Sequence, residues 1–306
     1  MSRLLSSAAL ISVGSLLLAS TSACARNNTS GDEHADHAAT PASTVASGAM
    51  ASDASMPAGA LDVAQRLAKS PRHGEWVMVR TGPSDSVKAW VVYPERSTKA
   101  PVVVVVHEIF GLSTWVRGVA DQLAADGYIA IAPDLLTGKA AAAPGSDTLT
   151  QAVATAAIRT LQTSDVHRQL AAVGQYGMSL SAAEKTYGVV GFCWGGSTSF
   201  MHAVASPPGL GAAVVFYGAS PADSLLPRVK VPVLGLYGGD DARVDATVPP
   251  AEAVMRSLGK TFEPHTFAGA GHGFLRQQEG KDGANLSASR QAWPLTVAFF
   301  RKHLGR

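Results

Sequence analysis

The chain has 306 residues, of which 46% are hydrophobic and 16% are charged, so it holds enough apolar material for one large domain with a single core. The formal net charge is +2 and no dense stripe of Lys or Arg is present, which leaves a nucleic-acid-binding or polybasic membrane-binding role without an electrostatic basis. Two cysteines, Cys24 and Cys193, are too few for a disulfide framework.

The first 25 residues have the pattern of an export signal. A positive start at Arg3 is followed by an apolar stretch over 4–19 and by a region rich in small residues. The apolar stretch is short for a membrane span, so the pattern predicts an exported protein, periplasmic or secreted. Two processing routes stay open. One is cleavage after Ala25 by the A-x-A rule; the other is lipid attachment at Cys24, although Thr21 stands where a lipoprotein box usually has Leu.

Residues 26–60 have the composition of a flexible tether. Ala, Ser, Thr, Gly and Asp dominate, and large apolar groups are almost absent, so this stretch is not expected to offset its ordering entropy. His34 and His37 are candidate metal ligands within it, but a solvated linker is the preferred interpretation. The folded domain is expected to cover 61–306.

From residue 75 onward, strand and helix patterns alternate. Two β-rich runs at 75–80 and 87–94 enclose a turn-rich break and predict a hairpin. The Val run at 101–108 is typical of a central strand that is buried on both faces. Further strands are expected at 128–134, 186–192, 212–218, 231–238 and 262–267. Helices are expected at 114–127, 194–205, 250–259 and 284–304, and across an Ala-rich stretch at 147–185 with breaks at Gly174 and Gly177.

These elements predict an α/β fold, an open, doubly wound, mostly parallel sheet of about eight strands. In such sheets, ligands bind outside the carboxyl ends of the strands. Four predicted strand ends carry reactive side chains, and these are Glu108, Cys193, Asp241 and His272. The candidate site is therefore expected at this edge of the sheet.

The cysteine stands in the spacing Gly-x-Cys-x-Gly, from Gly191 to Gly195, at a predicted strand-to-helix turn. This is the nucleophile elbow of α/β-hydrolases with sulfur in place of oxygen, and the chain order nucleophile, acid, histidine is also theirs. The glycines are expected because the nucleophile is strained and Cβ atoms two residues to either side would collide. The N-terminus of the following helix favours a thiolate at Cys193. A buried structural cysteine in a Gly-rich turn is the alternative.

Over about residues 75–305, the chain resembles the dienelactone hydrolases. The resemblance rests on the motifs HEIFGL, APDLL, GFCWGG, FYG, GGDDARV and AGHGF, each at an expected strand end. It implies the α/β-hydrolase fold, with Cys193 as the nucleophile and His272 as its base. It also implies that Asp241 orients the histidine.

Two further roles follow from the same resemblance. Glu108 would interact with the cysteine before substrate arrives, and the backbone N–H groups of Ile109 and Trp194 would form the oxyanion hole. A carboxylate disfavours a second negative charge beside it and can hydrogen-bond a neutral thiol. We therefore expect Glu108 to keep Cys193 largely protonated until substrate enters.

Several assignments have neighbours of the same residue type. Asp240 and Asp245 are the alternatives for the acid, and His265 and His107 are the alternatives for the base. Neither histidine follows the final predicted strand as His272 does.

The substrate-binding residues are less well defined. Arg276 falls where the family would bind a substrate carboxylate, and the sequence does not place a second arginine for this task. Phe110, Trp115 and Tyr217 are candidate pocket walls or ordinary core residues. Asp134 also ends a predicted strand, and we expect it to bond loop amides.

The sequence therefore predicts an exported cysteine hydrolase that cleaves small esters or lactones through a thioester acyl-enzyme with a Cys-His-Asp triad. A general carboxylesterase or thioesterase would use the same triad. A non-catalytic binding domain and a thiol redox protein are further alternatives, the last without a nearby resolving cysteine. No metal or organic cofactor is expected. The expected partner is a small-molecule ester or lactone and no nucleic acid, membrane contact would come only through lipid at Cys24, and a monomer is expected.

Overall fold

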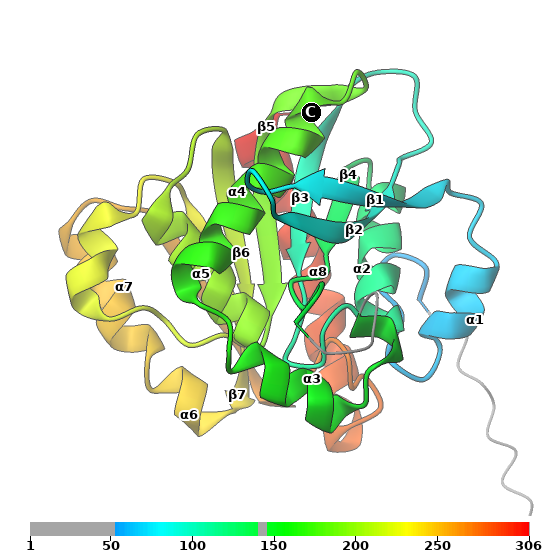
Figure 1. Cartoon of the computed structure of the whole chain (residues 1–306). Coiled ribbons are helices and arrows are strands. Elements are labelled where there is room, and N and C mark those ends of the chain that lie inside the picture. The colour runs from blue at the N-terminus through cyan, green and yellow to red at the C-terminus, as the bar shows by residue number, and fades with distance from the viewer. Residues whose placement is uncertain (1–52, 140–145, 306) are drawn as a thin grey trace, which may run out of the picture. The chain divides into compact units, whose positions relative to one another are not determined.

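The computed structural model describes residues 53–139 and 146–305, and its centre is one eight-stranded sheet in the order β1-β2-β4-β3-β5-β6-β7-β8 (Figure 1). The strands are β1 (Gly74–Arg80), β2 (Ser86–Val92), β3 (Ala100–Val106), β4 (Ile129–Pro133), β5 (Ala183–Phe192), β6 (Leu210–Phe216), β7 (Val233–Asp240) and β8 (Phe262–Gly271). β2 pairs antiparallel with β1 and with β4, and all other pairs are parallel. The predicted mostly parallel sheet with an opening hairpin is confirmed.

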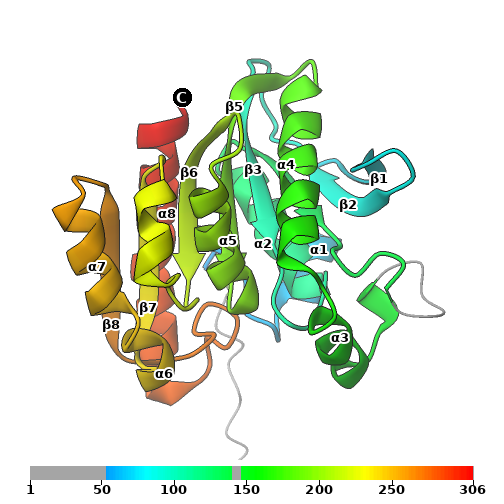
Figure 2. The same ribbon diagram turned by 60° about the vertical axis from the view of Figure 1, so that its left-hand side comes forward.

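Helices cover both faces of the sheet (Figures 1 and 2). One face packs against α2 (Thr114–Ala125) and α8 (Ala284–Leu304), and the other packs against α4 (Thr163–Ser179), α5 (Trp194–Ala205) and α7 (Val248–Ser257). The shorter helices are α1 (Val63–Ala68), α3 (Gln151–Ile158) and α6 (Ala242–Asp245). In Figure 1, α3 and α6 lie at the end of the sheet toward which the parallel strands point.

The central strand β3 connects the two layers of the core. Val103 and Val105 pack in the cluster that includes α2 and α8, whereas Val102, Val104 and Val106 pack in the cluster that includes α4, α5 and α7. All five valines have no exposed surface. The prediction that this run is buried on both faces is therefore confirmed, and alternation along the strand explains it.

The predicted breaks at Gly174 and Gly177 are wrong, because α4 continues through both glycines. A Cβ at Gly174 would lie 2.6 Å from the ring of Tyr187, and a Cβ at Gly177 would lie 2.6 Å from Val102. Both glycines thus serve close packing of the helix on the sheet. The cost of glycine in a helix is about 1 kcal/mol, which packing of this kind readily exceeds.

The folded domain begins earlier than predicted. The N-terminal strap, residues 53–62, lies against the domain, and its Met56 and Ala58 are only 2% and 4% exposed. The predicted tether over 26–60 is therefore wrong for its last eight residues, and 26–52 lie outside the described residues.

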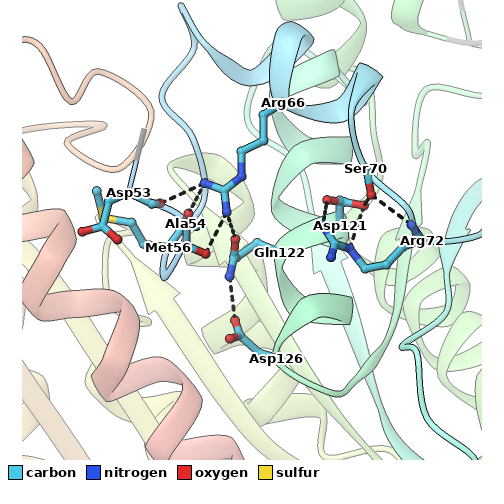
Figure 3. Close-up of polar contacts among 9 residues, drawn as sticks. All are labelled: Asp53, Ala54, Met56, Arg66, Ser70, Arg72, Asp121, Gln122 and Asp126. Carbon is cyan, nitrogen blue, oxygen red and sulfur yellow. Dashed lines mark hydrogen bonds and ion pairs between the residues drawn. The ribbon is translucent and has the colours of Figure 1, made fainter. Parts of the chain in front are cut away.

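The strap is held mainly through its backbone carbonyls (Figure 3). The guanidinium of Arg66 in α1 donates to three strap carbonyls at 2.6 to 3.0 Å and also to Gln122 of α2. The indole N–H of Trp115 donates to the carbonyl of Ala58 at 3.2 Å. Every residue type carries a carbonyl acceptor, so the composition of the strap gives no sign of this attachment.

The other side of the strap contacts the loop that follows β8. The N–H of Ala60 donates to the carbonyl of Arg276 at 2.8 Å, and the side-chain amide of Gln278 donates to the carbonyl of Pro57 at 2.8 Å. The strap thus connects α2 to the loop that carries Arg276.

A chain that starts at Leu61 is expected to be less stable than one that starts at Asp53. It loses the burial of Met56 and Ala58 and leaves the Trp115 N–H without its acceptor, together about 3 kcal/mol. In a domain of this size, that loss corresponds to a fall in Tm of roughly 6–12 °C. Calorimetry on both chains measures it, with Met56→Ala in the longer chain as a partial version. Equal Tm values would contradict the packing described.

Candidate active site

The register between β3 and β5 brings the predicted carboxylate and thiol to one level. Val106 pairs with Gly191, so Glu108 and Cys193 each stand two residues beyond the same paired position. β3 has β4 on one side and β5 on the other, and this change of direction in the strand order is the switch point where open α/β sheets bind ligands.

The register between β7 and β8 places the predicted acid beside the predicted base. Asp240 pairs with Gly271, and the next residues of the two strands are Asp241 and His272. The Nδ1 atom of His272 lies 2.5 Å from Oδ2 of Asp241. A carboxylate only accepts, so Nδ1–H donates to it and Nε2 of the neutral ring is left to take up a proton.

The two side chains of this pair differ strongly in their exposed fraction. The Asp241 side chain is 8% exposed, whereas the His272 side chain is 33% exposed. The alternative acids have other surroundings: Asp240 is an exposed partner of Lys281, and the pKa of Asp245 is raised, first by burial and then by the Asp241 charge. The structure therefore brings Asp241, and neither neighbour, to the histidine.

Cys193 has the backbone of a strained turn. Its φ is 56° and its ψ is −116°, and α5 begins at the next residue. The two flanking glycines permit this turn, because a Cβ at Gly191 would lie 1.9 Å from the carbonyl oxygen of Gly195 and a Cβ at Gly195 would lie 2.4 Å from that of His107. Close approach thus requires glycine at both positions, as the sequence predicts.

The surroundings of the thiol keep it neutral in this state. Burial and then the charge of Glu108 raise the pKa of Cys193, while the backbone N–H of Trp194 and the guanidinium groups of Arg243 and Arg276 act in the opposite direction. The stabilisation of the thiolate by the N-terminus of α5 is therefore smaller than its destabilisation by burial and by the charge of Glu108.

Glu108 itself is a buried carboxyl in an ion pair. Its side chain is 3% exposed, and Oε2 lies 2.8 Å from Nε of Arg276. Burial raises the pKa of Glu108 to about 7, against the lowering effect of the guanidinium. Arg276, expected to bind a substrate carboxylate, is thus paired with Glu108 here, and it also lies 5.1 Å above the ring of Phe110. The pair was not predicted from the sequence.

Tyr217 belongs to the buried core at the point where the core meets the predicted base. Tyr217 directly follows Phe216, the last residue of β6, and has a φ of 40°. Phe216 pairs with Phe192, the residue that precedes Cys193. The ring of Tyr217 contacts the His272 ring at a centroid distance of 5.2 Å. Its buried hydroxyl has no hydrogen-bond partner among residues 53–139 and 146–305. Tyr217 is therefore a fully buried core residue whose ring contacts the predicted base.

Trp115 is a core residue as well. It packs edge-on against Phe192 at 4.9 Å, and its N–H is used by the N-terminal strap. It lies in the first turn of α2, on the face of the sheet that α2 and α8 cover, so of the two interpretations the structure supports the ordinary core residue.

A second cation near the thiol, Arg243, comes from the GGDDARV motif. Arg243 follows the acid by two residues, is exposed, and its charge lowers the pKa of Cys193. The position of Arg243, just beyond the carboxyl end of β7, is the feature of the sequence that could have predicted a cation at this site.

The two predicted oxyanion-hole residues pack against the same small hydrophobic cluster. The side chains of Ile109 and Trp194 both pack against a small cluster made by Leu136 and residues of α3. Ile109 follows Glu108 beyond the end of β3, and Trp194 follows Cys193 at the start of α5, so both residues lie at the same edge of the sheet.

Comparison with known proteins shows the family of the chain. The family model of the dienelactone hydrolases matches residues 87–304. The chain belongs to the dienelactone hydrolase family. Two relatives described as provisional carboxymethylenebutenolidases come from Salmonella typhimurium, 28% identical over 250 residues with 72% of this chain and 85% of the relative covered, and from Methylorubrum extorquens, 29% identical over 231 residues with 71% and 77% covered.

Solved structures show the same fold. A provisional dienelactone hydrolase from Klebsiella pneumoniae has a TM-score of 0.66 at 24% identity, over 76% of this chain and 99% of that one. The dienelactone hydrolase-like promiscuous phosphotriesterase P91, from metagenomic libraries, has a TM-score of 0.66 at 22% identity with the same shares covered.

No helix within residues 53–139 and 146–305 is long and apolar enough to cross a membrane. Within the same ranges, no group of three or more His, Cys, Asp or Glu side chains is arranged to hold a metal ion. His34, His37 and Cys24 lie outside the described residues.

Glu108→Gln is expected to raise the rate at which iodoacetamide alkylates Cys193 above pH 7. The substitution removes a negative charge that raises the thiol pKa. Because Glu108 loses its proton near pH 7, its wild-type carboxyl is uncharged below that pH and resembles Gln, so the two rates should converge there.

The measurement uses a chain that starts at Asp53, in which Cys193 is the only cysteine. Glu263→Gln, which changes an exposed partner of Lys302, is the matched control and should leave the rate unchanged. Equal or slower alkylation of Glu108→Gln at pH 8 would contradict the effect assigned to the carboxylate.

Proposed function

We propose that the protein hydrolyses small esters or lactones through a thioester formed on Cys193. The observation that carries the proposal is the strained turn at Cys193, which follows β5. Glu108 follows the neighbouring strand β3 at the same level, and the hydrogen-bonded pair of Asp241 and His272 follows β7 and β8 at the same edge of the sheet. Names of the curated relatives, provisional carboxymethylenebutenolidases, support a lactone as the substrate class.

Acylation begins when substrate enters beside Glu108. Nε2 of His272 takes the thiol proton, and the sulfur attacks the carbonyl carbon of the ester. The developing oxyanion accepts hydrogen bonds from the N–H groups of Ile109 and Trp194. The C–O bond then breaks, and the imidazolium of His272 protonates the leaving oxygen, which in a lactone stays attached to the acyl group.

Deacylation reverses these roles with water. His272 removes a proton from water, the hydroxide attacks the thioester carbonyl, and the same N–H groups stabilise the second oxyanion. The C–S bond breaks, the imidazolium of His272 returns its proton to the thiolate, and the carboxylic acid product loses its own proton to solvent and leaves as a carboxylate. Arg276 and Arg243 place positive charge near the thiol, where a carboxylate substrate or product would be stabilised.

Export forms part of the proposal. The pattern of residues 1–25 supports secretion to the periplasm or beyond, with either cleavage after Ala25 or lipid at Cys24. Mass spectrometry of the mature N-terminus after expression in a Gram-negative host distinguishes a diacylglyceryl adduct on Cys24 from an unmodified new end. An intact Met1 in the cytoplasmic fraction would overturn export.

The activity is tested with a panel of p-nitrophenyl esters, enol-lactones and thioesters, with an aryl phosphotriester added because a structural relative hydrolyses that class. The wild-type chain should turn over esters or lactones, and Cys193→Ala should lose this turnover. Intact-mass measurement with a slow ester should show an acyl adduct that the variant lacks. Turnover that survives Cys193→Ala would exclude the proposed nucleophile, and binding without turnover would favour a non-catalytic domain.

His272→Ala should be more damaging than Asp241→Asn. The histidine carries the proton, a contribution of about 10²–10⁴-fold, whereas the aspartate orients and charges it. Steady-state kcat with the best ester measures both losses. Asp240→Asn is the matched control, because Asp240 carries the same carboxylate one residue away and pairs with Lys281. If Asp240→Asn were damaging and Asp241→Asn silent, the acid would be Asp240.

A further inference from the structure

The side chain of His107 is fully buried directly before Glu108, and the proposed mechanism gives it no proton to move. Its Nε2 lies 3.2 Å from the backbone nitrogen of Leu135, and its Nδ1 lies 2.7 Å from the carbonyl oxygen of Glu108. A backbone N–H only donates and a carbonyl only accepts. The ring is therefore neutral with its proton on Nδ1, and that proton is donated to the Glu108 carbonyl.

This hydrogen bond acts on the peptide group that carries one oxyanion-hole donor. The carbonyl of Glu108 and the N–H of Ile109 belong to the same planar peptide and point in opposite directions when it is trans. The N–H of Gly111 donates to the same carbonyl at 3.2 Å. Two donors thus fix the carbonyl, and the direction of the Ile109 N–H is fixed with it.

The same ring also touches the other donor residue. The His107 ring stacks on the Trp194 ring at a centroid distance of 5.6 Å and an interplanar angle of 23°. The backbone of His107 is equally close to α5, since a Cβ at Gly195 would lie 2.4 Å from its carbonyl oxygen. His107 therefore contacts both residues whose N–H groups the mechanism uses, the peptide that carries the Ile109 N–H through its Nδ1–H and Trp194 through its ring.

A second layer of hydrogen bonds fixes the loop that holds His107. The Asp134 carboxylate accepts from the backbone N–H of Ser146 at 2.5 Å, from its hydroxyl at 2.7 Å and from the N–H of Leu136 at 3.1 Å. The Ser146 hydroxyl oxygen accepts from the N–H of Leu112 at 2.6 Å. Asp134 thus bonds loop amides, as the sequence predicts, and keeps the Leu135 N–H in place for His107.

We propose that His107 is a positioning residue for the oxyanion hole, which acts by holding the Glu108–Ile109 peptide and the Trp194 ring. The inference rests on the proposed function, because an oxyanion forms only if Cys193 attacks a carbonyl. His107 touches no reacting atom, so its effect should be confined to steps in which the oxyanion develops.

Three variants separate its contacts. His107→Asn keeps an amide donor near the place of Nδ1, His107→Gln offers an acceptor near the place of Nε2, and His107→Phe keeps only the stacking on Trp194. Removal of one oxyanion donor costs about 10²–10³-fold in kcat, so a misdirected donor should cost roughly 10–100-fold. We expect this loss in His107→Phe and His107→Gln, with KM within about twofold, and recovery to within about fivefold in His107→Asn.

Two further measurements distinguish positioning from general damage. Iodoacetamide alkylation of Cys193 forms no oxyanion, so its rate should be unchanged in all three variants. A trifluoromethyl ketone forms a hemithioketal oxyanion, so its affinity should fall in parallel with kcat/KM. Unchanged kcat in His107→Phe, or alkylation that falls together with turnover, would overturn the inference.

Where His107→Phe does not fold, the pair of amide variants decides the result. Activity in His107→Asn above that in His107→Gln supports the donor to Glu108, and equal loss in both overturns it. A wild-type chain without Cys193-dependent turnover would overturn the proposed function and the inference together. Retained activity in the His107 variants would overturn the inference alone.

Discussion

The active site depends on one close approach, that of the first turn of α5 to the end of β3. Gly195 lies so near the carbonyl of His107 that no side chain fits between them. This contact places the N-terminus of a helix, a thiol at positive φ and the end of the central strand in one small volume. The other site residues come to this point through the register of a parallel sheet, which requires no further adjustment of the backbone.

Much of the fold could be predicted because hydrophobic period and strand-end motifs are local properties of the sequence. The Val run of β3 and the elbow glycines behave as their patterns indicate. The errors have a common physical origin in contacts between distant segments. Gly174 resembles a helix break until the Tyr187 ring is placed against it, and the N-terminal strap resembles a tether until its carbonyls meet Arg66 and Trp115.

At the site, the residue types and their order along the chain could be predicted from the sequence. Which side chains pair with each other could not. The sequence leaves Arg276 as a substrate ligand, and only the fold shows that its nearest charge is Glu108. The hydrogen bonds of His107 were equally hidden, because both use backbone atoms that every residue possesses. Electrostatic pairs and backbone hydrogen bonds are set by three-dimensional neighbours, and a single sequence contains little record of them.

The N-terminal strap is bonded to the loop that carries one of the cations of the active site. The strap is short and has two small apolar anchors, so it opens at a lower free energy than the whole domain. Because the N–H of Ala60 is bonded to the carbonyl of Arg276, each opening also removes a hydrogen bond from the loop whose guanidinium faces Glu108. Exchange of the Ala60 amide proton is therefore a local probe of the loop that brings a guanidinium to Glu108, from a segment more than 130 residues before the thiol in the sequence.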